Sequence, residues 1–252
     1  MSEILVTGAQ SGIGKYICEQ LTGTPLTREN HQIINERHFD TIIHCANNRN
    51  KFPNSFELYQ YYLDNIQLTE RLVSCDHKTF IYLSTIEVYP YRPKIIWREN
   101  DKIPVSDLQG IYPYSKLISE KIVENAADTS VILRLSSLLG KYTRHNTTRR
   151  ILLKEKGPFS LSADSEFNFV SYEDVLGFID KATDSSMRGT FNVVTSKNIS
   201  LRKIASIANT EPVFGNYKYV TGNIANETIV QYEDAFAKTS EDIVRQYLKE
   251  LI

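Results

Sequence analysis

Tyr112 and Lys116 stand four residues apart in the segment YPYSKLISE (112–120). Residues at this spacing lie on one face of a helix, so the phenol and the ammonium group should point the same way. An ammonium group favours the phenolate and lowers the pKa of a tyrosine from its usual value of about 10. Tyr112 could then transfer a proton at a carbinol oxygen while a hydride moves at the attached carbon. Taken alone, the spacing is common by chance. Tyr114 lacks a lysine partner, which predicts a structural role.

Two hydroxyl residues, Ser84 and Thr85, end the apolar segment TFIYLST (79–85), which precedes the tyrosine–lysine pair in the chain. The segment has the character of a buried strand. Open α/β sheets bind their ligands at the carboxyl ends of strands. We therefore expect the hydroxyl groups of Ser84 and Thr85 to hold a substrate oxygen.

A glycine-rich loop, GAQSGIG (8–14), separates the first apolar segment from a run with helical spacing. A pyrophosphate can approach the backbone only where no Cβ intrudes, and the N–H groups and dipole of a helix start attract the anion. This context between strand and helix favours dinucleotide binding over a loop that merely turns the chain. The residues expected to contact the cofactor are Gly8, Gln10, Ser11, Gly12, Ile13 and Gly14.

Apolar strands and amphipathic helices alternate along the first 140 residues. The pattern predicts strands at 3–7, 41–46, 79–85 and 130–137, and helices at 12–21, 56–73 and 112–126. Such alternation predicts a parallel sheet with right-handed crossovers, the doubly wound α/β class of Rossmann-like folds. Residues 23–40 have room only for a short strand, TPLT, and a helix at 30–38, which predicts a trimmed sheet edge.

The character of the sequence changes after residue 140, where a basic segment, KYTRHNTTRR, precedes short mixed strands and helices. We predict a dinucleotide-binding domain at 1–140. A small α/β substrate-binding part at 141–252 should be interleaved with the last strands of the sheet. The final segment, TSEDIVRQYLKELI (239–252), begins with a capping box and continues as an amphipathic helix.

The overall composition argues against several classes of protein. The 252 residues carry a net charge of −1, which gives no reason to expect a nucleic-acid partner. No apolar stretch is long enough to span a bilayer, and the first seven residues do not have the pattern of a signal peptide. The three cysteines and five histidines lack the spacing of a disulfide framework or a metal site. We expect a cytoplasmic protein with no bound metal and no membrane association.

Eight motifs between residues 3 and 195 resemble the short-chain dehydrogenase/reductase superfamily, in particular its extended branch of nucleotide-sugar epimerases, dehydratases and reductases. They are TGAQSGIG, IIHCAN, DNIQLTERL, FIYLSTIEVYP, YPYSKLISEKIV, LRLSSLLG, FNFVSYEDV and GTFNVV. The resemblance implies that Thr85, Tyr112 and Lys116 are catalytic. The residues that it places at the cofactor are Ala46, Asn47, Asn65, Tyr112 and Lys116.

The segment STIEVYP (84–90) departs from the pattern of the family's 4,6-dehydratases, which have an Asp–Glu pair after the threonine. Here the pair is Ile86 and Glu87. Without an acid at position 86 we expect no dehydration, and we expect Glu87 to contact the substrate. The glycine loop also departs from the extended branch, since Ser11 stands where that branch usually has glycine.

Phe167 replaces an arginine that binds the nucleotide diphosphate in many epimerases of the family. Three arginines of the basic segment, Arg144, Arg149 and Arg150, could supply the guanidinium groups instead, since this group suits phosphate geometry. The alternative is that they form a solvated basic loop.

The choice between NADP and NAD depends on the residues that follow TPLT. A carboxylate there binds the ribose 2′-hydroxyl of NAD, whereas an arginine pairs with the 2′-phosphate of NADP. Arg28 comes first and favours NADP. Glu29 follows directly, so a shift of one residue would exchange their roles. Alternatively, Arg28 only caps the sheet edge in solvent.

The resemblance implies an NAD(P)-dependent oxidoreductase that acts on a nucleotide-linked sugar. Keto-sugar reduction is favoured, as in the reductases of deoxysugar pathways, with Tyr112 as proton donor and Lys116 supporting it. Epimerisation needs the same pair and is the first alternative. A non-catalytic dinucleotide sensor or regulatory protein is the alternative from another class, and the intact pair argues against it. The expected partner is a small molecule, a homodimer is one option for the assembly, and polysaccharide biosynthesis is the expected context.

Overall fold

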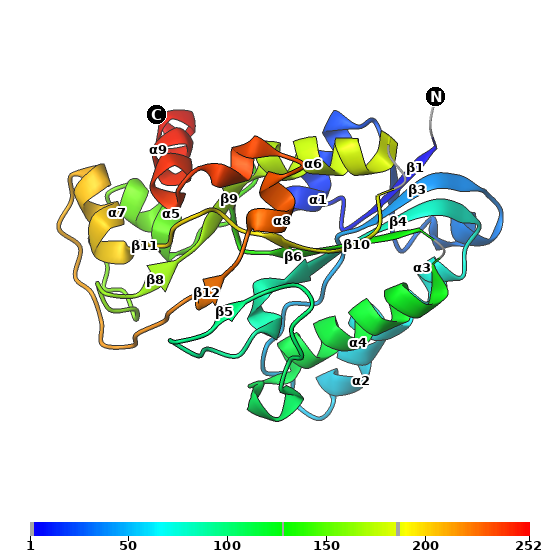
Figure 1. Ribbon diagram of the computed structural model, residues 1–252, viewed down its shortest axis with the longest axis horizontal. Helices are drawn as coiled ribbons and strands as arrows, with labels where there is room; N and C mark the ends of the chain where they lie inside the picture. Colours follow the sequence, from blue (N-terminus) through cyan, green and yellow to red (C-terminus); the bar gives the residue numbers. More distant parts are fainter. Residues whose placement is uncertain (1–2, 128, 185–186) are drawn as a thin grey trace. The chain divides into compact units, whose positions relative to one another are not determined.

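The computed structural model describes residues 3–127, 129–184 and 187–252. It contains a six-stranded sheet with the order β10-β6-β4-β3-β1-β2 (Figure 1). The strands are β1 (Ile4–Thr7), β2 (Thr24–Leu26), β3 (Phe39–His44), β4 (His77–Thr85), β6 (Ser130–Leu135) and β10 (Gly189–Val193). β1 pairs in parallel with β2 and β3, and β3 pairs in parallel with β4. The predicted doubly wound α/β class and its strands are confirmed.

The strand order reverses direction beside β1. The chain runs from β1 outward to β2 and then returns to the other side of β1 as β3, where Thr7 lies opposite His44. In an open α/β sheet, a crevice for ligands lies at the carboxyl ends of the strands at such a reversal. The fold therefore brings together the loops that follow Thr7 and His44.

The predicted trimmed edge is present in the sheet. β2 has three residues, and the segment between it and β3 contains only a 3-10 helix, η1 (His31–Asn35). The sequence predicted a longer helix at 30–38. No further strand–helix unit fits between β2 and β3, so β2 is the end of the sheet on this side.

Helices cover both faces of the sheet. α1 (Gly12–Gln20) lies on one side, and α3 (Leu68–Val73) and α4 (Ile111–Ala126) lie on the other (Figure 1). Coverage of both faces explains the nearly continuous apolar character of the strands. On the α3–α4 side, buried side chains of the helices and the sheet form one core: Leu5, Ile34, Phe39, Ile42, Leu72, Val73, Phe80, Tyr82, Val123 and Ile132.

The segment predicted as one helix at 56–73 is helical in three parts. α2 (Glu57–Tyr62) is followed by a π-helix, η2 (Leu63–Gln67), and then by α3. Phe56 and Tyr59, which the sequence placed in the apolar pattern of this helix, are 93% and 70% exposed. The residues that turn inward are instead Tyr61, Asn65, Thr69 and Leu72.

The described residues form two compact units. The first comprises those within 1–90, 99–134 and 178–191, and the second comprises 91–98, 135–177 and 192–252. The predicted boundary at residue 140 stays a prediction, since the two units exchange segments at several points. Two 3-10 helices of the first unit, η3 (Ile86–Val88) and η4 (Val105–Asp107), flank the segment assigned to the second. No helix among the described residues is long and apolar enough to cross a membrane.

The second unit contains three strand pairs: β7 (Ser137–Leu139) with β9 (Phe169–Ser171), β8 (Glu166–Phe167) with β11 (Ile199–Ser200), and β5 (Ile96–Trp97) with β12 (Asn223–Ile224). Its helices are α5 (Thr147–Leu152), α7 (Leu201–Ala208), α8 (Glu227–Val230), η5 (Asp234–Ala237) and α9 (Ser240–Leu251), and α6 (Tyr172–Asp184) begins in it. The predicted capping box opens α9, because Thr239 and Asp242 each accept a hydrogen bond from the other's backbone N–H.

Candidate active site

The glycine loop lies against the carboxyl end of β3. Gly8 and Gly12 have φ angles of +67° and +59°, a region that favours glycine. A Cβ on Gly8 would lie 2.9 Å from the backbone nitrogen of Ala46, and one on Gly14 would lie 2.5 Å from the oxygen of Gly8. The loop is therefore tight enough to require glycine, and it places the amino end of α1 at the strand reversal, as the sequence predicted. The cofactor contacts predicted for the loop, from the glycines as well as from Gln10, Ser11 and Ile13, all stay predictions.

A buried histidine ties the ends of β1 and β3 together. The hydroxyl oxygen of Thr7 accepts hydrogen bonds from the backbone of Cys45 (3.0 Å) and Ala46 (2.9 Å), so its proton goes to Nδ1 of His44 (2.7 Å). Nε2 of His44 then donates to Thr69 Oγ1 at 3.0 Å. Burial lowers the pKa of His44 to about 3, with Lys116 contributing, so the imidazole is neutral. Sequence analysis missed this histidine, although its position in the apolar segment TIIHCA was a signal.

Asn65 lies in the π-helix and holds the segment after β3. Its Oδ1 accepts from the backbone N–H of Asn48 (2.7 Å), and its Nδ2 donates to the carbonyl oxygen of Asn48 (3.0 Å). The carbonyl oxygen of Asn65 accepts hydrogen bonds from the hydroxyl groups of Thr69 and Ser119, each at 3.0 Å. π-Helical turns often mark functional sites. Asn65 thus positions the segment of Ala46 and Asn47, and the predicted contacts of all three residues with a cofactor stay predictions.

Tyr112 and Lys116 lie in the first two turns of α4, which begins after Gly110. Lys116 is 4% exposed, and its ammonium group donates to the carbonyl oxygen of Leu83 at 2.8 Å. It also lies 4.8 Å from the centre of the Tyr82 ring. Burial lowers the pKa of Lys116 to about 8. A hydrogen bond from this lysine to the end of β4 therefore fixes the helix that carries Tyr112 against the strand.

Tyr114 has a different environment from Tyr112. Its hydroxyl group donates to the carbonyl oxygen of Val105 at 2.9 Å, which joins α4 to η4. This contact agrees with the predicted structural role of Tyr114.

The two hydroxyl residues at the end of β4 differ in their contacts. Thr85 is 7% exposed, and its oxygen accepts from the backbone N–H of Glu87 at 3.2 Å, so its own proton can go to a substrate oxygen. The hydroxyl group of Ser84 donates to the buried carboxylate of Glu120. A substrate contact by Ser84 would compete with this hydrogen bond, and the predicted substrate contacts of Ser84, Thr85 and Glu87 stay predictions.

A buried ion pair supports this strand end. Nη2 of Arg134 lies 2.8 Å from Oε2 of Glu120, whose side chain is fully buried, and Nη1 donates to the Tyr89 hydroxyl at 2.6 Å. Ser84 completes the set of partners around the carboxylate. The sequence patterns did not predict this ion pair. A signal that could have revealed it is that one charged residue stands in each of two apolar segments, SVILRL and SKLISEKI.

Arg28 follows β2 at the edge of the sheet and is 88% exposed. Its guanidinium group lies 3.9 Å from a carboxylate oxygen of Asp64. A hydrogen bond to Thr27 lowers the pKa of the neighbouring Glu29. The chain thus presents Arg28 at the expected place, and its contact with a 2′-phosphate stays a prediction.

Arg149 and Arg150 lie on α5 in the second unit. Arg150 donates to Glu155 at 2.7 Å and stacks over the ring of Phe159, whereas Nε of Arg149 is buried without a hydrogen-bond partner among the described residues. Phe167, which replaces the family arginine, stacks on Tyr219 with ring centres 4.8 Å apart. Of the two arginines, Arg149 is better suited to bind an anion, and the predicted substrate contacts of both stay predictions.

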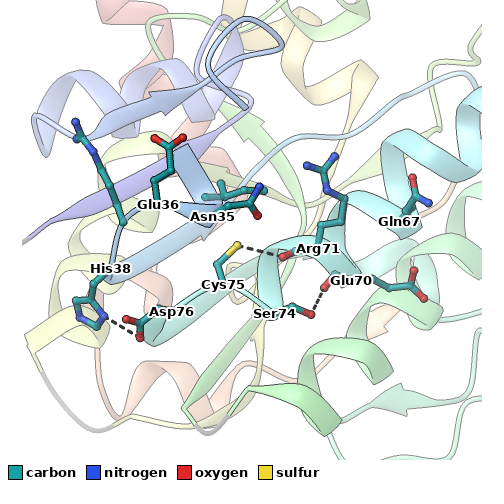
Figure 2. A pocket seen from close by; sticks show the side chains of 11 residues that line it. Asn35, Glu36, His38, Gln67, Glu70, Arg71, Ser74, Cys75 and Asp76 are labelled. Atoms are coloured by element: carbon teal, nitrogen blue, oxygen red, sulfur yellow. Dashed lines mark hydrogen bonds and ion pairs between the residues drawn. The ribbon is translucent and has the colours of Figure 1, made fainter. Parts of the chain in front are cut away.

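A cavity of about 750 Å³ lies at the other end of the sheet (Figure 2). It is lined by residues 34–38, before β3, and by Gln67, Glu70, Arg71, Ser74, Cys75 and Asp76, before β4. Nδ1 of His38 lies 3.0 Å from a carboxylate oxygen of Asp76 there, and Cys75 donates to the carbonyl oxygen of Arg71. Since Thr85 and the glycine loop lie at the carboxyl ends of the strands, this cavity is separate from the candidate active site.

The NAD dependent epimerase/dehydratase family matches residues 26–193, which include Thr85, Tyr112 and Lys116. The chain belongs to this family. Membership in the NAD dependent epimerase/dehydratase family confirms the predicted family, the enzyme class and the dependence on a nicotinamide dinucleotide. No curated protein sequence matches the chain.

Solved structures of similar fold cover nearly the whole length of this family member. A dTDP-4-dehydrorhamnose reductase from Bacillus anthracis in complex with NADP is 20% identical with a TM-score of 0.79, and 99% of each chain is covered. A second such reductase, from Yersinia enterocolitica, is 20% identical with a TM-score of 0.81 and full coverage of both chains. A UDP-N-acetylglucosamine 4-epimerase from Bacillus cereus is 17% identical with a TM-score of 0.77, covering 100% of this chain and 99% of that chain. These likenesses confirm the fold.

Proposed function

We propose that the protein reduces a keto group of a nucleotide-linked sugar, with Tyr112 giving its proton to the substrate oxygen. The observation that carries the proposal is the position of Lys116. Its ammonium group is buried one turn after Tyr112 and bonded to the carbonyl oxygen of Leu83, two residues before Thr85. A buried cation there favours the phenolate that remains after the proton has left.

The hydroxyl group of Thr85 would donate a hydrogen bond to the same substrate oxygen and orient it toward Tyr112. When bound, the nicotinamide supplies the hydride for the adjacent carbon. The glycine loop, Ala46 and the segment held by Asn65 would bind this cofactor at the strand reversal. Arg149 is proposed to bind the anionic part of the substrate.

The nucleotide sugar as substrate is supported by what similar proteins bind. One solved structure of similar fold, at 17% identity and a TM-score of 0.80, is in complex with UDP-glucuronic acid and NAD. Of the two cofactors, we propose NADP, because the exposed Arg28 lies at the end of β2, where its guanidinium group could pair with a 2′-phosphate.

The position of Ile86 supports the absence of dehydration. Ile86 is 7% exposed and offers no proton, so elimination of water would need another acid. We propose that a 4,6-dehydratase reaction on an intact nucleotide hexose does not occur.

The assembly and the location of the protein stay predictions. Phe52, Phe56 and Tyr59 are 89%, 93% and 70% exposed, and aromatic side chains are enriched at protein interfaces. Their exposure is compatible with a homodimer as one option for the assembly. We propose a cytoplasmic location with no nucleic-acid or membrane partner, which the net charge of −1 and the lack of a long apolar stretch support.

The decisive experiment separates reduction from epimerisation. With dTDP-4-dehydrorhamnose as a first probe and a panel of nucleotide keto-sugars after it, a reductase consumes NADPH in proportion to the substrate. An epimerase returns the cofactor and converts a nucleotide sugar such as UDP-N-acetylglucosamine with no net change in nicotinamide absorbance. NADPH consumption supports the proposal, and epimer formation without consumption supports the alternative.

A further inference from the structure

A second lysine lies beside the candidate proton donor. Nζ of Lys51 is 5.0 Å from the centre of the Tyr112 ring, a cation–π distance. Lys51 belongs to the segment after β3 and not to α4, and its side chain is 48% exposed. Lys51 therefore lies over the ring of Tyr112, whereas Lys116 comes one helical turn after Tyr112 on α4.

Glu87 holds the ammonium group of Lys51. Nζ lies 2.8 Å from one carboxylate oxygen of Glu87 and 2.6 Å from the other. Glu87 lies in η3, and its backbone N–H donates to the hydroxyl oxygen of Thr85. The ion pair is thus connected through one residue to the hydroxyl group proposed to orient the substrate.

The segment that carries Lys51 is bonded on its amino side and passes close to α4. Asn65 binds both backbone groups of Asn48, and Nδ2 of Asn48 donates to Asp64 at 2.9 Å. A Cβ on Gly110 would lie 4.0 Å from the carbonyl oxygen of Lys51, an ordinary van der Waals distance, so the segment passes the start of α4. Within this segment, the ion pair with Glu87 holds the ammonium group of Lys51.

The charged and titratable groups around Tyr112 come from four elements. Lys116 is on its own helix, Lys51 is on the segment after β3, and Glu87 is on η3. Tyr82 of β4 also lies near, and burial raises its pKa well above the usual range, with Tyr112 contributing. Glu120 is paired with Arg134, so the charges that the proposal concerns are the ammonium group of Lys51 and the carboxylate of Glu87.

We propose that Lys51 is a positioning residue that acts through Tyr112. Its ammonium group stabilises the phenolate from the ring face, while Lys116 does so from the same helix. Glu87 fixes Lys51 in this position and offsets its charge. The role rests on the proposed function only in taking Tyr112 as the proton donor.

The two halves of the ion pair should change the acidity of Tyr112 in opposite directions. Lys51→Met leaves the carboxylate of Glu87 without its ammonium partner and should raise the apparent pKa of Tyr112. We expect a rise of only about 0.5–1, because solvent screens the half-exposed charge of Lys51. Glu87→Gln leaves the ammonium group unopposed and should lower it by a similar amount. Lys51→Arg retains the charge and should restore the wild-type value.

Spectrophotometric titration of the phenolate band measures this acidity without cofactor or substrate. The chain has 15 tyrosines, so each variant is compared with the same variant carrying Tyr112→Phe, and the difference isolates one phenol. The titration can therefore succeed even if the reductase assay fails. The pH profile of kcat/KM, where turnover is found, should shift in the same two directions.

An ion pair far from Tyr112 provides matched controls. Lys78, near the start of β4, pairs with Asp40 of β3, and Lys78 lies seven residues and ~23 Å from Thr85 along the strand. Lys78→Met and Asp40→Asn make the same chemical changes at that distance and should leave the titration of Tyr112 unchanged. Opposite shifts in Lys51→Met and Glu87→Gln, with unchanged controls, support the proposal. An unchanged titration in both variants, or shifts of the same sign, would overturn it.

Discussion

The two ends of β4 carry polar side chains in contrasting environments. At the carboxyl end, Ser84, Glu120 and Arg134 are nearly or fully buried and are joined by hydrogen bonds. At the amino end, Lys78 pairs with Asp40 at the surface, and the Lys78 side chain is 68% exposed. The carboxyl end of β4 thus lies against a buried polar network, whereas its amino end carries a surface ion pair.

This contrast indicates that the geometry of the carboxyl end of β4 is fixed by buried polar groups, at a cost in folding free energy. A buried ion pair costs desolvation and tolerates no missing partner, whereas an exposed pair contributes little. The buried network lies directly behind Thr85 and Lys116, the residues proposed to act on the substrate. Buried polar groups at the carboxyl ends of the strands should therefore be costly to remove, whereas exposed charged groups should be cheap to remove.

The largest effect is expected for Glu120→Ala. The variant leaves Arg134 buried without its carboxylate partner, which should lower the free energy of unfolding by about 3–5 kcal/mol. Urea denaturation measures the change. The double variant Glu120→Leu/Arg134→Met removes both charges and should recover a large part of the loss. If Glu120→Ala lowers the free energy of unfolding no more than removal of the exposed Lys78–Asp40 pair does, the buried network does not support this strand end.

His44, which is buried at the carboxyl end of β3, should make the stability of the protein sensitive to acid. Its pKa is lowered to about 3 in the folded protein, from a usual value near 6.5. Between these values the unfolded chain binds the proton more readily, so stability falls as the pH drops below about 6.5. From pH 6.5 to pH 5 the loss should be about 2 kcal/mol. His44→Gln should remove this part of the pH dependence, and equal slopes in both proteins would contradict the buried neutral imidazole.

Arg28→Ala tests an exposed residue at the carboxyl side of the sheet. Arg28 forms only a long ion pair with Asp64, so its loss should leave stability unchanged. The ratio of specificity constants for NADP over NAD should fall by about tenfold, since an arginine pairs with the 2′-phosphate. A preference for NAD that the substitution does not alter would refute the assignment of NADP.

Lys78→Met should have the smallest effect. The lysine is exposed, and the carboxylate left behind, Asp40, is solvated. We expect the Tm to change by no more than about 2 °C. A drop comparable to that of Glu120→Ala would remove the difference between the two ends of the strand.

The sequence predicted the strands of the sheet well because each is a short apolar run between turns. It also placed the glycine loop before a helix and Tyr112 and Lys116 at the start of another, and these positions are confirmed, while the roles of the residues stay predictions. The π-helix was not predictable from periodicity, because the buried residues Tyr61, Asn65 and Leu72 keep ordinary helical spacing through it.

The polar network was missed for another reason. Glu120 and Arg134 are 14 residues apart and meet only after α4 packs on the sheet, and the partner of each could not be read from its own segment. The same holds for Lys51 and Glu87, which are 36 residues apart. Long-range pairs of this kind decide the electrostatics of the site, whereas local patterns decide only where the site lies.

The central claim is that Tyr112 donates the proton, and Tyr112→Phe tests it most directly. The variant keeps Lys116 and the glycine loop, so NADPH should bind with a Kd within about twofold of the wild type, as measured by nucleotide fluorescence. On the keto-sugar substrate that the wild type reduces, kcat should fall at least ~100-fold, because general acid catalysis is lost. Turnover at the wild-type rate by Tyr112→Phe would contradict the account.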